Sequence, residues 1–212
     1  KPSARAAVAA ALHELFGQRL GQPVWRLWGL DPETAPLSSF TLGLDKPEVM
    51  RQKVREAESY PILKVKVGTA RDEEVLALIR EEAPTKVLRV DANTAWSAAE
   101  AIAKLPMLES YGVELVEQPV PAGDLEGLAR VRSRARIPIV ADESCTVASE
   151  IPRLAGCVDG INIKLAKCGS LREAVRMVHV ARAHGLGVML GCMIESTPRF
   201  KDAAIVSSFV RS

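Results

Sequence analysis

The chain has 212 residues, of which 48% are hydrophobic and 25% are charged, a composition typical of a globular protein with a continuous core. Its 28 basic and 26 acidic residues give a formal net charge of +2 and are spread along the whole length. This distribution excludes a concentrated basic surface for nucleic acid or an anionic membrane. Apolar runs are shorter than a membrane span, and no secretory pattern follows the first residues. We therefore expect a cytoplasmic protein without nucleic-acid or membrane partners.

The first predicted element is an amphipathic helix in the segment SARAAVAAALHELFG. Its apolar side chains recur at helical spacing. They are Val8, Leu12, Leu15 and Phe16. Ser3 is the candidate N-cap, and Gly17 is the candidate stop at the C-terminal end. A loop containing several prolines follows, so residues 1–37 are expected to form a helix and a loop that lead into the main domain.

From residue 38 to residue 212 a pattern of strand, loop and helix repeats about every 25 residues. The seven candidate strands are apolar, and they centre near Thr41, Val65, Leu88, Leu115, Ile139, Ile163 and Val188. Capping boxes begin two of the intervening helices, at Ser97 with Glu100 and at Ser170 with Glu173. Gly185 is expected to stop the second of these helices.

Apolar strands that alternate with helices predict a parallel sheet covered by helices, either an open doubly wound sheet or a closed barrel. Seven regular units favour the barrel. An eightfold barrel normally needs about 250 residues, whereas this sequence ends after STPRFKDAAIVSSFVRS, which reads as a helix with no eighth strand after it. The expected fold class is therefore an α/β (β/α)8-type TIM barrel, incomplete at its C-terminal end, with residues 38–212 as the barrel domain.

Three acidic residues follow apolar strands at equivalent positions: Asp91 in VLRVDAN, Glu117 in VELVEQP and Asp142 in IPIVADES. The C-terminal ends of barrel strands converge on one mouth, where three carboxylates would repel one another unless a cation neutralised them. Oxygen ligands suit magnesium better than zinc. Taken singly, each acid has an ordinary explanation as an Asx turn, a loop acid or a helix cap. Together they predict a Mg²⁺ site.

Two lysines end strands on either side of this acidic set, Lys66 in ILKVKVG and Lys164 in GINIKLAK. They could face a bound substrate from opposite sides, and two bases on two faces allow inversion of a carbon centre. An ammonium acts as a base only when its pKa falls from about 10.4, and burial, a neighbouring ammonium and a divalent cation all lower that pKa. Lys64, on the same strand face as Lys66, supplies such a neighbour. The alternative for any single lysine is a snorkelling surface residue.

These motifs together resemble the barrel domain of the enolase superfamily, in its muconate lactonizing enzyme subgroup. The matching segments occur in order from about Tyr60 to Thr197, and they are KVK at Lys64–Lys66, DAN at Asp91, EQP at Glu117, ADES at Asp142 and NIKLAKCG from Asn162. Within the subgroup, GCMIEST at Gly191–Thr197 looks most like the dipeptide epimerases of the L-Ala-D/L-Glu type.

The resemblance implies that Asp91, Glu117 and Asp142 bind Mg²⁺, and that Lys66 and Lys164 are the acid–base pair. It also implies that Lys64 supports Lys66 electrostatically. The implied reaction is the epimerisation of a dipeptide, in which the α-proton is removed and returned through an ene-diolate, as enolase-type sites do with a lysine base and magnesium. A small carboxylate substrate and a homo-oligomer are the expected partners.

Two departures from the family pattern accompany the resemblance. Members normally carry an N-terminal capping domain, and the sequence begins at the helix that follows that domain. Dipeptide epimerases also continue to an eighth strand and an Asp-x-Asp element, which are not found in this sequence. Muconate cycloisomerase or o-succinylbenzoate synthase chemistry on the same lysines remains an alternative. A further alternative is an inactive barrel fragment that associates through an open sheet edge.

Overall fold

A computed structural model of the chain describes residues 1–193. Its contacts divide the chain into two compact units. Unit 1 comprises residues 1–36, 145–155 and 160 onward, and unit 2 comprises residues 37–144 and 156–159. The predicted helix in STPRFKDAAIVSSFVRS, most of the GCMIEST segment and the question of an eighth strand lie outside the described residues.

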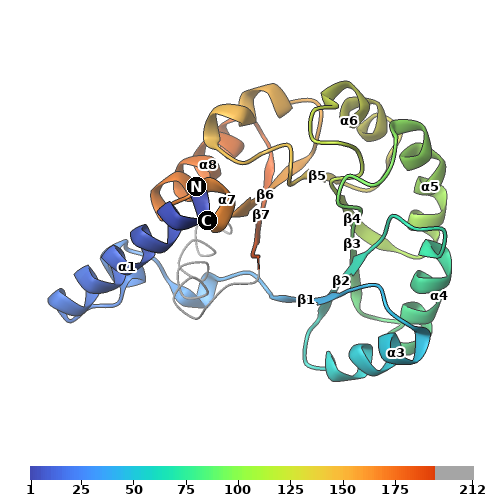
Figure 1. Ribbon diagram of the computed structural model, residues 1–212, viewed down its shortest axis with the longest axis horizontal. Helices are drawn as coiled ribbons and strands as arrows, with labels where there is room; N and C mark the ends of the chain where they lie inside the picture. The colour runs from blue at the N-terminus through green and yellow to red at the C-terminus, as the bar shows by residue number, and fades with distance from the viewer. Residues whose placement is uncertain (194–212) are drawn as a thin grey trace. The chain divides into compact units, whose positions relative to one another are not determined.

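Unit 2 contains parallel strands that neighbour one another in chain order. They are β1 (Ser39–Leu42), β2 (Ile62–Lys66), β3 (Val87–Asp91), β4 (Val113–Glu117) and β5 (Ile139–Ala141). The helices that connect them are α3 (Pro47–Glu56), α4 (Asp72–Glu82), α5 (Ala98–Ser110) and α6 (Leu125–Arg132). Each helix returns the chain along the same side of the strands (Figure 1), as a parallel βα repeat requires. The predicted α/β class and these five strands are confirmed.

In β2 and β3, alternate residues are apolar and buried on one face of the sheet. Leu63 and Val65 of β2 and Leu88 and Val90 of β3 are all fully buried, as expected of strands covered by helices. The start of α5 is the predicted capping box. Ser97 Oγ accepts a hydrogen bond from the Glu100 backbone N–H at 3.2 Å, and the Ser97 N–H donates to Glu100 Oε2 at 2.8 Å.

Unit 1 contains the two other predicted strands, β6 (Gly160–Lys164) and β7 (Gly187–Gly191), which pair in parallel. Its helical segments are α1 (Pro2–Leu20), α2 (Val24–Leu27), the 3-10 turn η1 (Pro32–Thr34), the 3-10 segment η2 (Ala148–Leu154), α7 (Leu165–Cys168) and α8 (Leu171–Ala183). A regular helix was expected in the segment that holds η2. Pro152 lies inside that segment, and because proline removes a backbone donor and clashes with the preceding turn, it limits the segment to a short 3-10 form.

The second predicted capping box, at the start of α8, is only half formed. Ser170 Oγ accepts from the Glu173 N–H at 3.1 Å. The Glu173 carboxylate, however, accepts from the Ala148 N–H at 2.8 Å, which ties η2 to α8. Gly185 follows the helix with a φ of 69°, so the predicted stop is confirmed.

The predicted ends of α1 were wrong. Lys1 occupies the N-cap position without a side-chain hydrogen bond, and Ser3 lies inside the helix. Gly17 also lies inside the helix and is buried. A Cβ there would stand 2.8 Å from the Gln22 carbonyl oxygen, so glycine leaves room for that carbonyl. Gly21, with a φ of 61°, ends the helix instead, as a left-handed C-terminal glycine commonly does.

The predicted apolar face of α1 exists, but it does not face the core. Ala6 and Ala10 are the buried side chains of the helix. The larger apolar side chains are 47–61% exposed, and they are Val8, Leu12, Leu15, Phe16 and Leu20. Among residues 1–193, no helix combines the length and apolar character needed to cross a membrane.

Candidate functional site

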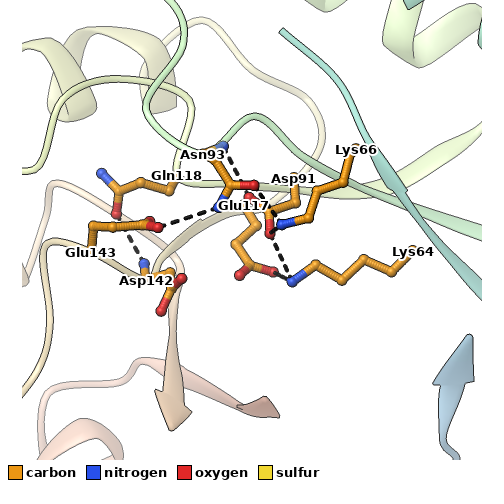
Figure 2. Close-up of polar contacts among 8 residues, drawn as sticks. All are labelled: Lys64, Lys66, Asp91, Asn93, Glu117, Gln118, Asp142 and Glu143. Carbon is orange, nitrogen blue, oxygen red and sulfur yellow. Dashed lines mark hydrogen bonds and ion pairs between the residues drawn. The ribbon is translucent and has the colours of Figure 1, made fainter. Parts of the chain in front are cut away.

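The strand register of unit 2 places the predicted site residues beside one another at the C-terminal strand ends. Lys66 pairs with Asp91, and Asp91 pairs with Glu117, across β2, β3 and β4. Asp142 follows β5 directly. Because neighbouring parallel strands lie about 4.8 Å apart, side chains on the same face at these positions can meet. Figure 2 shows them converging on one region.

Lys64 lies between two of the predicted metal ligands. Its Nζ is 2.9 Å from Asp91 Oδ2 and 2.6 Å from Glu117 Oε2. Lys66 Nζ approaches the same Asp91 oxygen at 2.7 Å and also contacts Asn93 Oδ1 (Figure 2). The two lysines therefore share one face of β2, as predicted, and their ammonium groups share one carboxylate.

Burial and charge act in opposite directions on these groups. Burial lowers the pKa of Lys64, but the charges of Glu117 and Asp91 outweigh it and raise the pKa above its ordinary value. Burial likewise raises the pKa of Asp91, yet Lys64 and Lys66 hold it below its ordinary value. Glu117 differs, because burial together with the charges of Asp91 and Asp142 outweighs Lys64 and raises its pKa. The cluster thus keeps Lys64 charged and disfavours ionisation of Glu117.

The chemistry of this donor set fits a divalent cation. Asp91, Glu117 and Asp142 are all fully buried, and three like charges in one buried cluster need a positive charge between them. Carboxylate oxygens are the donors that magnesium prefers. Among residues 1–193, no group of three acidic, histidine or cysteine side chains is already arranged around a common point that suits a metal ion. The ammonium groups of Lys64 and Lys66 contribute positive charge to Asp91 and Glu117.

Lys164 is the C-terminal residue of β6 in unit 1, where it pairs in register with Gly191 of β7. It is 7% exposed. A Cβ at position 191 would stand 2.9 Å from Lys164 Cε and 2.6 Å from Asn162 Oδ1. Glycine at this position therefore leaves the space that these two side chains occupy.

Four further polar residues of unit 2 belong to the site and were not predicted. Asn93 contacts Lys66 and donates to Glu143 Oε1 at 3.3 Å. Gln118 and Ser144 are buried and hydrogen-bonded to each other. Each of the four lies within three residues of a predicted acid, in DAN, EQP or ADES. The signal that could have indicated them is a polar side chain directly beyond an apolar strand end.

The sequence profile of the family described as Enolase C-terminal domain-like matches residues 48–209, which include all the predicted site residues. The chain belongs to the enolase C-terminal domain-like family. This membership accounts for the repeated strand and helix of both units, and for polar residues at the strand ends.

Similar proteins of this family include two epimerases. An L-Ala-D/L-amino acid epimerase from a Maribacter species is 41% identical over 191 residues, which is 90% of this chain and 56% of that protein. The L-Ala-D/L-Glu epimerase from Bacteroides thetaiotaomicron is 41% identical over 98% of this chain and 55% of its own length.

A solved structure gives a further comparison. The dipeptide epimerase from Enterococcus faecalis, complexed with Mg and the dipeptide L-Leu-L-Tyr, matches with a TM-score of 0.89 and 40% identity. That match covers 97% of this chain and 60% of the neighbour. The chain therefore spans a little over half of the length of the curated relatives that it matches.

Proposed function

We propose that this chain is the barrel part of a magnesium-dependent dipeptide epimerase, which removes the α-proton of a dipeptide and returns it to the opposite face through an ene-diolate. The observation that carries the proposal is the cluster of buried Asp91, Glu117 and Asp142 with Lys64 and Lys66 at adjoining strand ends. Its similarity to proteins named as dipeptide epimerases supports the choice of substrate. The proposal includes residues 38–212 as the barrel domain and a homo-oligomer as the assembly.

In this proposal Asp91, Glu117 and Asp142 hold Mg²⁺. The bound ion supplies positive charge to the substrate carboxylate and so favours loss of the neighbouring proton. Lys64 has a raised pKa, so it stays an ammonium and adds positive charge beside Lys66 rather than acting as a base. Lys64 is assigned this supporting role because its ammonium group lies between Asp91 and Glu117.

Lys66 and Lys164 are proposed as the acid–base pair. Lys66 is oriented by Asp91 and Asn93, and Lys164 extends from the end of β6. One lysine removes the α-proton from one face of the carbon, and the other donates a proton to the opposite face. Each lysine is therefore the base for one epimer and the acid for the other.

Hydrogen exchange tests the reaction directly. The full protein that carries this sequence is incubated with Mg²⁺ in deuterated water and a panel of dipeptides, together with substrates of the cycloisomerase and synthase alternatives. We expect deuterium at the α-carbon of the C-terminal residue of one dipeptide class, measured by mass spectrometry and NMR. If no dipeptide acquires deuterium, the epimerase proposal is rejected.

Variants of the two lysines test their roles in the same assay. Lys66→Ala and Lys164→Ala should each slow exchange from one epimer by about 100-fold or more, the usual contribution of a positioned acid or base, and slow the other epimer less. Lys53→Ala is the control, because the Lys53 side chain pairs with Asp45 at the surface, away from the buried acids. Equal and mild losses from both epimers would contradict the two-face assignment.

A further inference from the structure

Every hydrogen-bonding position of the Gln118 side-chain amide is occupied by a partner from the protein. It follows Glu117 directly and is fully buried. Oε1 accepts from the backbone N–H groups of Asp142 at 2.9 Å and Ser144 at 3.1 Å. Nε2 donates to the Val120 carbonyl oxygen at 2.8 Å and to Ser144 Oγ at 2.9 Å. An amide has two acceptor and two donor positions, so the set is complete.

The backbone of Gln118 is tied to β5 on one side and to the loop after β3 on the other. Its N–H donates to the Val140 carbonyl oxygen at 2.8 Å, and its carbonyl oxygen accepts from the Thr94 N–H at 2.9 Å. Its φ is +38°, a conformation that a residue with a side chain adopts only where its surroundings impose it. Gln118 therefore connects the segments that follow β3, β4 and β5, directly beside the strand ends at which Asp91, Glu117 and Asp142 lie.

From these contacts we infer that Gln118 is a positioning residue for cation binding. It fixes the backbone of Asp142 relative to Glu117 and Asp91, and so sets the size of the oxygen cluster that selects the cation. Figure 2 shows the Gln118 amide directed at the Asp142 backbone, beside the acids and not among them. The inference rests on the proposed function, because it takes these three acids as the cation ligands.

The contacts explain why this position requires glutamine. Glutamate has the same shape but would place an acceptor oxygen against the Val120 carbonyl. It would also remove the donor to Ser144 Oγ, which itself donates to the Ala122 carbonyl at 2.9 Å. Asparagine is one methylene shorter and cannot span the same partners. Both substitutions should leave the three acids in place while loosening the loop that carries Asp142.

The test measures metal binding without any substrate. Mn²⁺ affinity is measured by electron paramagnetic resonance, and Mg²⁺ and Ca²⁺ affinities are measured by competition. For Gln118→Glu and Gln118→Asn we expect Mn²⁺ to bind at least about tenfold more weakly, as is usual when a group that orients a ligand is lost. We also expect the preference for Mg²⁺ over Ca²⁺ to fall at least about threefold, since Ca²⁺ tolerates a wider and more flexible set of oxygens.

The selectivity ratio separates positioning from a merely structural role. Partial unfolding would weaken both ions equally and leave the ratio unchanged, and that result would overturn the inference. Gln52→Glu is the matched control, because Gln52 is exposed and its amide contacts only Glu56 on the same helix among the described residues. It should leave both affinities and their ratio as in the parent protein.

The remaining outcomes distinguish this inference from the proposed function. If Asp142→Asn abolishes Mn²⁺ binding while Gln118→Glu binds like the parent, the inference fails and the proposed metal site stands. If the parent itself binds no Mn²⁺, both fail. Ser144→Ala, which removes one partner of the Gln118 amide, serves if the glutamine variants do not fold. It should lower the ratio in the same direction by a smaller factor, and an unchanged ratio would overturn the inference.

Discussion

At the scale of single residues, Lys64 is one of two lysines that bring positive charge to the acidic cluster. Its ammonium lies within 2.9 Å of oxygens from both Asp91 and Glu117. Removing one partner from a buried ion pair costs about 3–5 kcal/mol, because the other charge remains buried. The stability of the metal-free chain should therefore depend on Lys64, and this dependence should vary with pH.

Lys64→Met should destabilise the metal-free chain more at high pH than at low pH. The pKa of Glu117 is already raised above 4.5, and it rises further when the opposing charge of Lys64 is lost. A carboxyl group with a raised folded pKa contributes stability that is fully present below its unfolded pKa and is lost as the pH rises through the folded pKa. We expect a loss of about 3 kcal/mol near pH 8 and less near pH 4, measured by urea unfolding in a chelator.

The control for this prediction is Lys53→Met. Lys53 pairs with Asp45 at 3.2 Å, and both side chains are more than a third exposed. An exposed pair contributes about 0–1 kcal/mol, so the control should change little at either pH. An equal loss for Lys64→Met at both pH values would show that Glu117 is not the group responsible.

Sequence reasoning identified the charged residues of the site but not how they pair. Asp91, Glu117 and Lys66 could be placed because each ends an apolar strand. The contact between Lys64 and Glu117 spans from β2 to β4, so it depends on cross-strand register and side-chain reach. The role of Gln118 was missed for a similar reason, since its partners come from loops that pack together only in the folded chain.

At the scale of elements, the loop after β2 is shaped by a close backbone contact at Gly68. Its φ is +115°, and a Cβ there would stand 2.5 Å from the Ala95 Cβ, in the loop after β3. The Gly68 N–H also donates to Asp72 Oδ1 at 2.9 Å, at the start of α4. The loop that follows Lys66 is therefore held against the loop that follows Asp91.

Gly68→Ala should destabilise the chain by about 2–4 kcal/mol, because it combines backbone strain at positive φ with overpacking. Gly43→Ala is the matched control, since a Cβ at Gly43 meets nothing within 4 Å and alanine there restricts the unfolded chain. Thermal and urea unfolding of the two variants provide the measurement. A loss for Gly68→Ala no larger than that of the control would show that the loops do not pack as described.

Element types were more predictable than element ends. The seven strands were placed correctly because apolar runs at a regular spacing are a strong signal. The end of α1 was misplaced because two glycines, Gly17 and Gly21, offered the same stop signal. In the structure Gly21 adopts the left-handed conformation with a φ of 61°, whereas Gly17 stays helical beside the Gln22 carbonyl oxygen, and neither feature is visible in the sequence.

At the scale of the whole molecule, the apolar face of α1 lies outside the core of this chain. Leu12 is 59% exposed, whereas Leu154 of the same unit is fully buried. The amphipathic pattern correctly predicted a helix with an apolar face. It could not predict that small alanines, and not the larger side chains, would face the rest of the unit.

Leu12→Ala and Leu154→Ala form a matched pair that tests this burial. Leu12→Ala should change the free energy of unfolding by no more than about 0.5 kcal/mol, as exposed positions usually do. Leu154→Ala should cost about 2–5 kcal/mol, because it leaves a cavity in a packed interior. Urea unfolding of the chain gives both values, and similar losses for the two variants would contradict the described packing of α1.

Lys64 has a further consequence for how the protein is made. Small metal-dependent domains often stay unfolded until their ion arrives, because nothing else neutralises their ligands. Here Lys64 and Lys66 bring positive charge from within the chain itself to Asp91 and Glu117. On the proposed function, this unit can therefore fold before magnesium binds to these acids.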